Sequence, residues 1–232
     1  MTITSCIDFS DSRDSAAPRL RRAFGTPRER LMAHQLSEVR PVLDAVQAAA
    51  LQGRWCVGYL RYEAAPAFDA ALAVHAPDGP LAWFAVYDEA LPWPEDSEEG
   101  SAQVRWVETC PRPAFGAAMD DIQRAIAAGD LYQVNFTAPL LGAWQGAPQE
   151  GAAQALFAAL RRAQPGGYAA FLDTGDEQLL SVSPELFFDW HGGRILTRPM
   201  KGTAPRGTTP AEDAALAQTL RSSPKELSLI HI

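Results

Sequence analysis

The sequence has few cysteines, no long apolar run and no basic leader, and each of these lacks excludes a class of protein. Its three cysteines, Cys6, Cys56 and Cys110, are scattered along 232 residues. A sparse, odd set is typical of reduced thiols in a cytosol and not of a disulfide framework. No spacing of cysteine and histidine fits a zinc site. No apolar run approaches the roughly 20 residues that span a membrane, and no basic segment precedes an apolar one as in a secretory signal. We therefore expect a cytoplasmic protein that is not associated with a membrane.

The charge balance argues against nucleic acid as a partner. The formal net charge is -8, with 47% hydrophobic and 21% charged residues, which is ordinary for a soluble globular protein. Nucleic-acid binding needs a basic surface that neutralises phosphates. The length is sufficient for one large domain or two small ones.

Apolar periodicity predicts several helices and strands along the chain. Helices are expected where apolar residues recur at helical spacing before a glycine or proline, and strands where apolar and aromatic residues cluster. The expected helices are 37–51 with Ser37 as N-cap, 115–128, 152–163, and a segment capped by Thr209 that runs to about Arg221. The expected strands are 55–63, 81–87, 130–137, 168–172, 178–182, 186–190 and 194–198. Residues 1–30 are interpreted as an extended segment whose arginines form a solvated face, and 88–103 as an acidic, proline-containing connection.

The stretch from Ser183 to Gly207 carries the main candidate site. It predicts a β-hairpin that turns at His191-Gly192-Gly193, followed by a lysine between a proline and a glycine. Gly202 allows a close backbone approach, and Thr203 supplies a hydroxyl. In an acidic chain, a local excess of positive charge suggests an anionic ligand; the charged residues are Arg194, Arg198, Lys201 and Arg206 against Glu185 and Asp189. The alternative is that the lysine and the strand arginines are ordinary solvated residues.

A second candidate stretch is Asp130–Thr137. Strand alternation would place Gln133 and Asn135 on one face and the apolar Tyr132, Val134 and Phe136 on the other. A row of amides on such a strand is either a solvent face or the lining of a site.

The two stretches together resemble the chorismate-utilising enzymes, such as anthranilate synthase component I, aminodeoxychorismate synthase component I and isochorismate synthase. Ser-Pro-Glu-Leu-Phe and Arg-Pro-Met-Lys-Gly-Thr-Ala-Pro-Arg-Gly are similar to the signature of this family, whose usual form is Pro-Ile-x-Gly-Thr-x-Pro-Arg-Gly. Position x is typically Ala in anthranilate and isochorismate synthases and Lys in aminodeoxychorismate synthases, and here it is Lys201. Gly-Asp-Leu-Tyr-Gln-Val-Asn-Phe-Thr resembles a second family motif, and the residues around Gly58-Tyr59 and Tyr62–Pro66 resemble the N-terminal lobe of the aminodeoxychorismate synthases.

The resemblance implies the chorismate-binding-enzyme fold, an α+β fold with antiparallel sheets faced by helices. It also implies amination of chorismate at C4. Lys201 would be the nucleophile that adds at C2, and Glu185 the general acid for the departing C4 hydroxyl. Ammonia would then attack C4 and expel the lysine, giving 4-amino-4-deoxychorismate on the route to 4-aminobenzoate and folate. The implied substrate-binding residues are Gly202, Thr203, Gln133, Asn135 and Arg198. Gln133 lies where isochorismate synthases carry a lysine that activates water, so the resemblance argues against water as the nucleophile.

The resemblance also implies a division of the chain and a set of partners. Residues 1–100 would form the N-terminal lobe and acidic linker, and 101–226 the first half of the catalytic domain. Residues 227–232 match a translated sequencing adapter and are predicted to be non-native. The family's Mg²⁺ ligands would lie beyond Glu226, so this chain by itself is expected to be inactive. None of the three cysteines fits a glutaminase, so ammonia would come from a glutamine amidotransferase subunit or from solution. The alternatives are anthranilate synthase component I, or a non-catalytic fragment that only binds a partner or ligand.

Overall fold

The computed structural model describes residues 2–14, 16–94, 103–146, 151–199 and 203–223. The chain divides into two compact units. The first unit comprises Met1–Pro94 with Arg161–Ile232, and the second comprises Glu95–Leu160. Each unit is described by itself.

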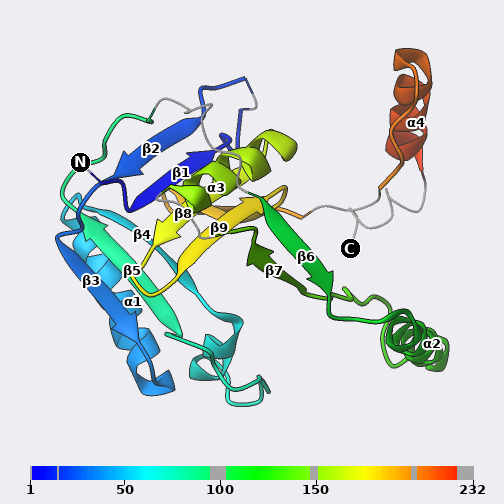
Figure 1. Cartoon of the computed structure of the whole chain (residues 1–232), viewed down its shortest axis with the longest axis horizontal. Helices are drawn as coiled ribbons and strands as arrows, with labels where there is room; N and C mark the ends of the chain where they lie inside the picture. Colours follow the sequence, from blue (N-terminus) through cyan, green and yellow to red (C-terminus); the bar gives the residue numbers. More distant parts are fainter. Residues whose placement is uncertain (1, 15, 95–102, 147–150, 200–202, 224–232) are drawn as a thin grey trace. The chain divides into compact units, whose positions relative to one another are not determined.

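Two antiparallel sheets form the body of the first unit (Figure 1). The four-stranded sheet has the order β2-β1-β8-β9, and the three-stranded sheet has the order β3-β5-β4. Their bounds are β1 Ser5–Phe9, β2 Leu20–Phe24, β8 Tyr168–Asp173 and β9 Gln178–Ser183, then β3 Glu29–Ala33, β5 Ala82–Tyr87 and β4 Trp55–Leu60. The pairing of β1 with β8 joins segments more than 150 residues apart, with Ser5 opposite Leu172 and Phe9 opposite Tyr168. The N-terminal strand is therefore an interior strand of its sheet.

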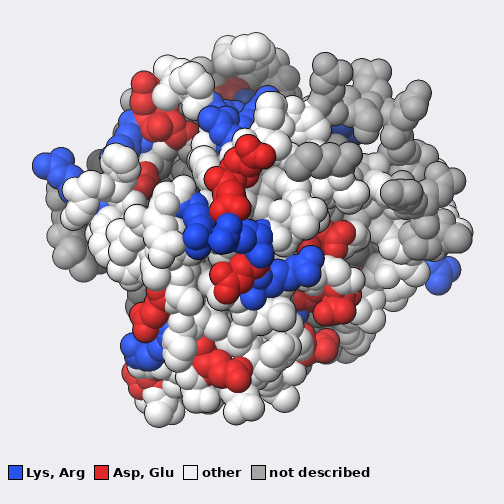
Figure 2. All heavy atoms as spheres, turned by 90° about the vertical axis from the view of Figure 1, so that its left-hand side faces the viewer, with Lys and Arg blue, Asp and Glu red and all other residues white. Residues whose placement is uncertain are grey.

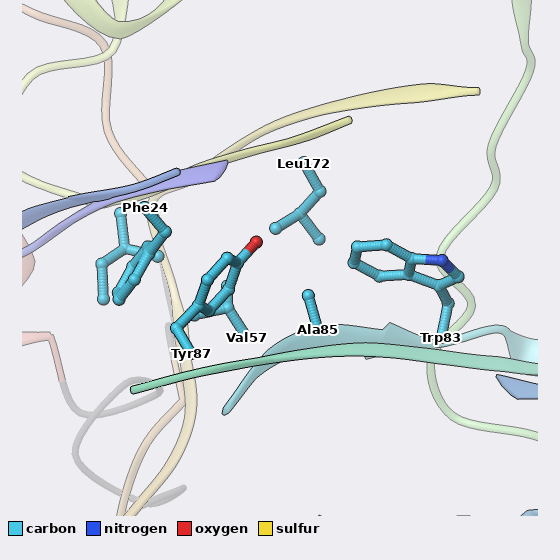
Figure 3. Close-up of a cluster of buried hydrophobic side chains, with 7 residues drawn as sticks. Phe24, Val57, Trp83, Ala85, Tyr87 and Leu172 are labelled. Carbon is cyan, nitrogen blue, oxygen red and sulfur yellow. The ribbon is translucent and has the colours of Figure 1, made fainter. Parts of the chain in front are cut away.

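An aromatic core fills the space between these two sheets (Figure 3). Phe24 and Leu172 project from the four-stranded sheet toward Tyr87 and Trp83 of β5, and each of these side chains is at most 2% exposed. Phe24 stacks on Tyr87 with ring centroids 4.7 Å apart. The Tyr87 hydroxyl lies 2.8 Å from the Ser5 hydroxyl, which satisfies the polar end of a buried ring.

Helix α1, Leu36–Leu51, packs on the three-stranded sheet. Its buried residues Val39 and Val42 share a cluster with Ala33 of β3 and Ala82 of β5. The helix begins after Gln35, whose N–H donates to the Glu38 carboxylate at 3.0 Å, so the cap is Gln35 and not Ser37 as the sequence predicts. A short 3₁₀ helix, η1 Tyr62–Ala67, follows β4 where the sequence predicts that the strand continues.

The first unit also contains a hairpin and a C-terminal helix. The hairpin is β10 Leu186–His191 paired with β11 Arg194–Arg198. Helix α4, Pro210–Ser222, begins at Thr209, whose hydroxyl accepts the Glu212 N–H at 3.2 Å. The predicted hairpin and the predicted helix cap are both confirmed.

The second unit contains a second hairpin and a long helix. Strands β6 Val104–Glu108 and β7 Leu140–Trp144 pair antiparallel. Helix α2 spans Arg112–Ala128 and ends at Gly129, whose φ of 83° gives a left-handed C-cap. Helix α3, Ala152–Ala163, contains the boundary between the units. Of the described residues, none lies in a helix long and apolar enough to cross a membrane.

Two further predictions about secondary structure are wrong. Residues 130–137, predicted to be a strand, are irregular and mostly exposed, and the strand in this part of the chain begins only at Leu140. Residues 1–30 do not form one extended segment, because they contain β1, β2 and the start of β3. The predicted solvated face is confirmed for the exposed Arg21, Arg22, Arg28 and Arg30, but not for Arg19. The reason is long-range pairing: β1 is stabilised by β8, which a local pattern does not reveal.

The two compact units of this chain are not separated by a single boundary near residue 100. Strand β8 of the predicted catalytic half completes the sheet of the predicted N-terminal lobe. The division into a lobe and a catalytic half stays a prediction for the longer fold.

Candidate functional site

The β10–β11 hairpin brings two of the predicted site residues to one end. Its register pairs Leu186 with Arg198, so Glu185, one residue before Leu186, and Arg198 lie at the open end of the hairpin. At the other end, Gly192 and Gly193 turn the chain with φ of 58° and 73°. Positive φ at two successive positions is the geometry of a tight two-residue turn. Both Glu185 and Arg198 are exposed.

The N-terminal segment anchors this hairpin. The Ser12 hydroxyl donates to the Asp189 carboxylate, and Arg198 Nη1 donates to the Ser12 carbonyl at 3.2 Å. Arg13 adds a longer ion pair with Asp189 at 3.8 Å. Because the two strands are each tied to Ser12, the open end of the hairpin is fixed against the N-terminal segment.

A pocket of about 550 Å³ lies where that anchor meets the four-stranded sheet. Its polar lining includes Ser10, Arg19 and Arg198, and its apolar lining includes Tyr168 and Leu186. Arg19 is held in place by bonds to the Ser10 hydroxyl, the Gly167 carbonyl and the Asp8 carboxylate. The lining also includes the Asp11 carboxylate, so the pocket offers charges of both signs beside an aromatic ring, which suits a small polar molecule.

Below the pocket lies a buried carboxylate, Asp8, which is 1% exposed. It accepts hydrogen bonds from Arg19 and Arg161 and forms an ion pair with Arg21 at 3.2 Å. Burial by itself would raise the pKa of Asp8, but the hydrogen bonds from the three arginines outweigh it and lower the pKa below its ordinary value. The charged form of Asp8 thus holds Arg19 in the pocket wall.

A second charged group links β4 to the turn between β8 and β9. Glu177 accepts two hydrogen bonds from Arg61 Nη2, at 2.6 and 2.7 Å, and one from the Tyr59 hydroxyl. Burial, followed by the bond to Glu177, raises the pKa of Tyr59 to about 12. Tyr59, Arg61 and Glu177 thus link the two sheets of the first unit, and none of them lines the pocket near Arg19.

On the face of the molecule shown in Figure 2, basic side chains gather near the middle with acidic side chains beside them. Charges of both signs adjoin on this face, so it is not a uniform basic surface of the kind that attracts polyanions.

The structure places the remaining predicted site residues as follows. Lys201 and Gly202 lie outside the described residues, and Thr203 is exposed and outside regular structure. Gln133 and Asn135 are exposed in the irregular segment of the second unit, so they line no strand face. Nearby, the Phe136 ring contacts Phe115 of α2 edge-on at 5.6 Å. Arg206, predicted to be a cation near Lys201, is paired with Asp213 at 2.7 Å.

Two contributions to this region are not visible in the sequence pattern. Arg19 lines the pocket beside Arg198, although 179 positions separate them along the chain. Ser12 ties both strands of the hairpin. A single sequence contains no signal for either, because only the β1–β8 pairing brings the N-terminal segment to this place.

Within the described ranges, no group of three or more acidic, cysteine or histidine side chains could hold a metal ion.

Comparison with known proteins identifies the class. The family model for chorismate binding enzymes matches residues 13–228, so this chain belongs to that family. It is 42% identical over 117 residues to an aminodeoxychorismate synthase of Streptomyces griseus, covering 50% of this chain and 15% of that protein. It is 35% identical over 121 residues to aminodeoxychorismate synthase component 1 of Klebsiella aerogenes, covering 52% and 26%. It is 36% identical over 126 residues to an anthranilate synthase component 1 of Haloarcula marismortui, covering 54% and 24%.

The fold has a solved counterpart. A structure described as a 2,3-dihydroxybenzoate-specific isochorismate synthase from Bacillus anthracis matches with a TM-score of 0.65 at 18% identity. The match covers 97% of this chain and 56% of that one. The predicted α+β chorismate-binding-enzyme fold is confirmed. The matched region spans about a quarter or less of the curated relatives named above.

Proposed function

We propose that this chain is the first part of an enzyme that replaces the C4 hydroxyl of chorismate with an amine, giving 4-amino-4-deoxychorismate. The observation that carries the proposal is Lys201, at the variable position of the Arg198–Gly207 motif. The names of the Streptomyces and Klebsiella relatives support the same reaction.

In the proposed reaction, the neutral Lys201 amine forms a bond to C2 of chorismate. Both ring double bonds shift, C1=C2 to C1=C6 and C5=C6 to C4=C5, and the C–O bond at C4 breaks, while Glu185 gives a proton so that the oxygen leaves as water. Ammonia then attacks C4, the double bonds shift back, and the lysine departs as an amine. An ordinary lysine, with a pKa of about 10.4, is almost wholly protonated near pH 7, so the reaction needs a site that favours the neutral amine.

The geometry of the hairpin is compatible with these roles. Glu185 and Arg198 share its open end, and Lys201 follows Arg198 by three positions. The anchors to Ser12 would hold that end in place, which is what a positioned acid and nucleophile require. Thr203 and Gly202 complete the proposed substrate-binding loop, and Gln133 and Asn135 are proposed to bind the substrate from the other motif.

The proposal includes a metal and two partners. Mg²⁺, when bound, would neutralise the ring carboxylate of chorismate, and we propose that its ligands lie beyond Glu226. Ammonia would come from a glutamine amidotransferase subunit. The place of the reaction would be the cytoplasm, on the route to 4-aminobenzoate and folate.

A second candidate is the reaction of anthranilate synthase component 1, which the name of the Haloarcula relative favours at similar identity. The two reactions start from chorismate and differ in product. Lys201 in place of alanine speaks for amination at C4, because alanine has no nucleophile to add at C2. The third candidate is that the chain is a non-catalytic fragment, which binds chorismate or a partner but does not convert chorismate to a product.

The experiment is a product and adduct assay on the polypeptide encoded by the complete gene. With chorismate, Mg²⁺ and ammonia, we expect 4-amino-4-deoxychorismate in the chromatogram and a covalent adduct on the peptide that contains Lys201. Lys201→Ala should lose both. Lys201→Arg should also lose both, since a guanidinium stays charged. The matched control is Lys225→Ala, which removes the chain's other lysine and should leave both signals.

Three results would overturn the proposal. A covalent adduct that persists in Lys201→Ala would show that Lys201 is not the nucleophile. Anthranilate as the product would establish the second candidate. Binding of chorismate without any product by the wild-type polypeptide would establish the third.

A further inference from the structure

The second unit is an insertion, because the chain leaves the first unit after Pro94 and returns to it at Arg161. The departing segment is fixed to β2 through Leu91. The Leu91 N–H donates to the Ala23 carbonyl at 2.8 Å, and the Leu91 carbonyl accepts the Ala23 N–H at 3.1 Å. Ala23 is fully buried, so the core of the first unit holds the point where the chain leaves.

The departing and returning segments meet on one buried charge. The Arg161 guanidinium lies over the Trp93 ring, with 4.9 Å between the guanidinium carbon and the ring centroid. Arg161 Nη1 also donates to the Asp8 carboxylate of β1 at 2.8 Å, and the Arg161 side chain is only 10% exposed. We call Asp8, Arg161 and Trp93 the clasp, because they join the two points at which the chain crosses between the units.

The ring face of Trp93 makes this contact, and its N–H does not. Trp93 Nε1 is buried and has no acceptor among the residues that the structure describes. A second guanidinium, that of Arg21, lies 6.0 Å from the same ring. A cation over an indole face contributes more when it is desolvated than when it is exposed. Because the Asp8 carboxylate orients Arg161, the guanidinium cannot turn away from the ring without breaking a buried ion pair.

Helix α3 carries the restraint into the second unit. Residues 152–160 of the helix belong to the second unit, and Arg161 to Ala163 belong to the first. Sharp bends in a helix have identifiable causes such as proline or glycine, and α3 contains neither. Fixing the last turn of α3 through Arg161 therefore restrains the whole helix. With Trp93 held by the same guanidinium, one contact restrains both connections of the second unit.

We propose that the clasp positions the second unit for substrate, so that Arg161 and Trp93 set the affinity for chorismate without touching it. The residues they would position are Gln133 and Asn135 of the second unit. The inference rests on the proposed function for the role of these two amides. The clasp itself rests only on the contacts described above, so each can be tested separately.

The first experiment uses no catalysis. Hydrogen exchange of the 232-residue chain is compared among wild type, Trp93→Leu and Trp93→Phe. Leucine keeps an apolar side chain but has no ring face, whereas phenylalanine keeps one. We expect the Leu91 amide to exchange about fivefold faster in Trp93→Leu and at close to the wild-type rate in Trp93→Phe. The control Trp106→Leu, at a 53% exposed tryptophan of β6, should leave the exchange of Leu91 unchanged.

The second experiment measures steady-state kinetics on the polypeptide encoded by the complete gene. We expect KM for chorismate to rise about threefold or more in Trp93→Leu, with kcat within about twofold of wild type. The reason is that the proposed general acid, Glu185, belongs to the first unit, whereas the amides that would bind substrate belong to the second. Arg161→Met should act in the same way, and Trp93→Phe should restore the wild-type KM.

Three outcomes would overturn the inference. Exchange at Leu91 that is equal in wild type and Trp93→Leu would show that the clasp restrains nothing. Equal exchange in Trp93→Leu and Trp93→Phe would assign the effect to burial and not to the ring face. Faster exchange with an unchanged KM would confine the clasp to the stability of the first unit. If the complete polypeptide makes no 4-amino-4-deoxychorismate, the proposed function fails, and the dissociation constant of chorismate replaces KM in this test.

Discussion

Replacing Asp8 by asparagine should destabilise the first unit more than any exposed ion pair could. The substitution keeps the shape of the side chain and removes its charge. Asp8 is buried in the interior strand β1 and faces Arg19, Arg21 and Arg161. Removing one partner of a buried pair leaves uncompensated charge and costs about 3–5 kcal/mol. This is a large share of the roughly 5–15 kcal/mol by which a domain is stable.

The matched control is Asp88→Asn. Asp88 also faces two arginines, Arg28 and Arg54, but its side chain is 59% exposed. Water and salt screen such a pair, so its loss should cost about 0–1 kcal/mol. The comparison therefore separates the effect of burial from the number of ion pairs.

The stability that Asp8 contributes depends on pH with a definite sign. Because the three arginines lower the pKa of Asp8 in the fold despite its burial, Asp8 contributes stability above the unfolded-state pKa of about 3.9. That contribution is lost as the pH falls through the folded-state pKa. The difference in the free energy of unfolding between wild type and Asp8→Asn should be largest near pH 7 and should shrink in acid.

The assay is urea unfolding at pH 7 and at acidic pH, with hydrogen exchange of the β1 peptide as a local report on the first unit. Equal losses for Asp8→Asn and Asp88→Asn at pH 7 would refute the reasoning. So would a loss for Asp8→Asn that grows as the pH falls.

Three further predictions concern packing and caps. Phe24→Ala, at a fully buried ring between the sheets, should cost about 3–5 kcal/mol in urea unfolding. Gly58→Ala should lower the thermal midpoint sharply, because the new Cβ would lie 2.2 Å from the Trp83 carbonyl oxygen. The control is Gly116→Ala in α2, where the new Cβ meets open space and should raise the free energy of unfolding by about 0.5–1 kcal/mol. Equal effects of the two substitutions would contradict the prediction. Thr209→Ala should weaken α4 by about 1 kcal/mol, seen as faster hydrogen exchange confined to that helix.

Much of the secondary structure was predictable because it depends on neighbours in the chain. The helical spacing and the Gly129 stop define α2, the two glycines after His191 set the turn of the β10–β11 hairpin, and Thr209 caps α4. The family was predictable for a different reason. The motifs around Lys201 and Gln133 are contiguous in sequence, so their chemistry can be read without coordinates.

The errors arise where the decisive partner is distant. The arginines of residues 1–30 have the composition of a solvated segment, yet Arg19 pairs with a buried carboxylate because β1 lies between β2 and β8. Residues 130–137 have the alternation of a strand but pair with no strand, and the pairing opposite Glu108 begins at Leu140. Alternation gives a residue its face only when a partner strand is present to pair with it.

By itself the sequence determined the family, the β10–β11 hairpin and the Thr209 cap of α4, because each depends on residues that are adjacent in the chain; it also supplied the proposed nucleophile, Lys201. Only the tertiary structure decided that Ser12 holds the hairpin, that Arg19 and Arg198 share a pocket wall, and that Asp8 is the buried counter-charge. The physical reason is that Ser12 and Arg19 meet the hairpin across more than 100 positions of sequence. Asp8 has a partner, Arg19, only 11 positions away, but it is buried because β1 pairs with the distant β8. Pairing and burial across such distances depend on the whole fold and leave no local pattern.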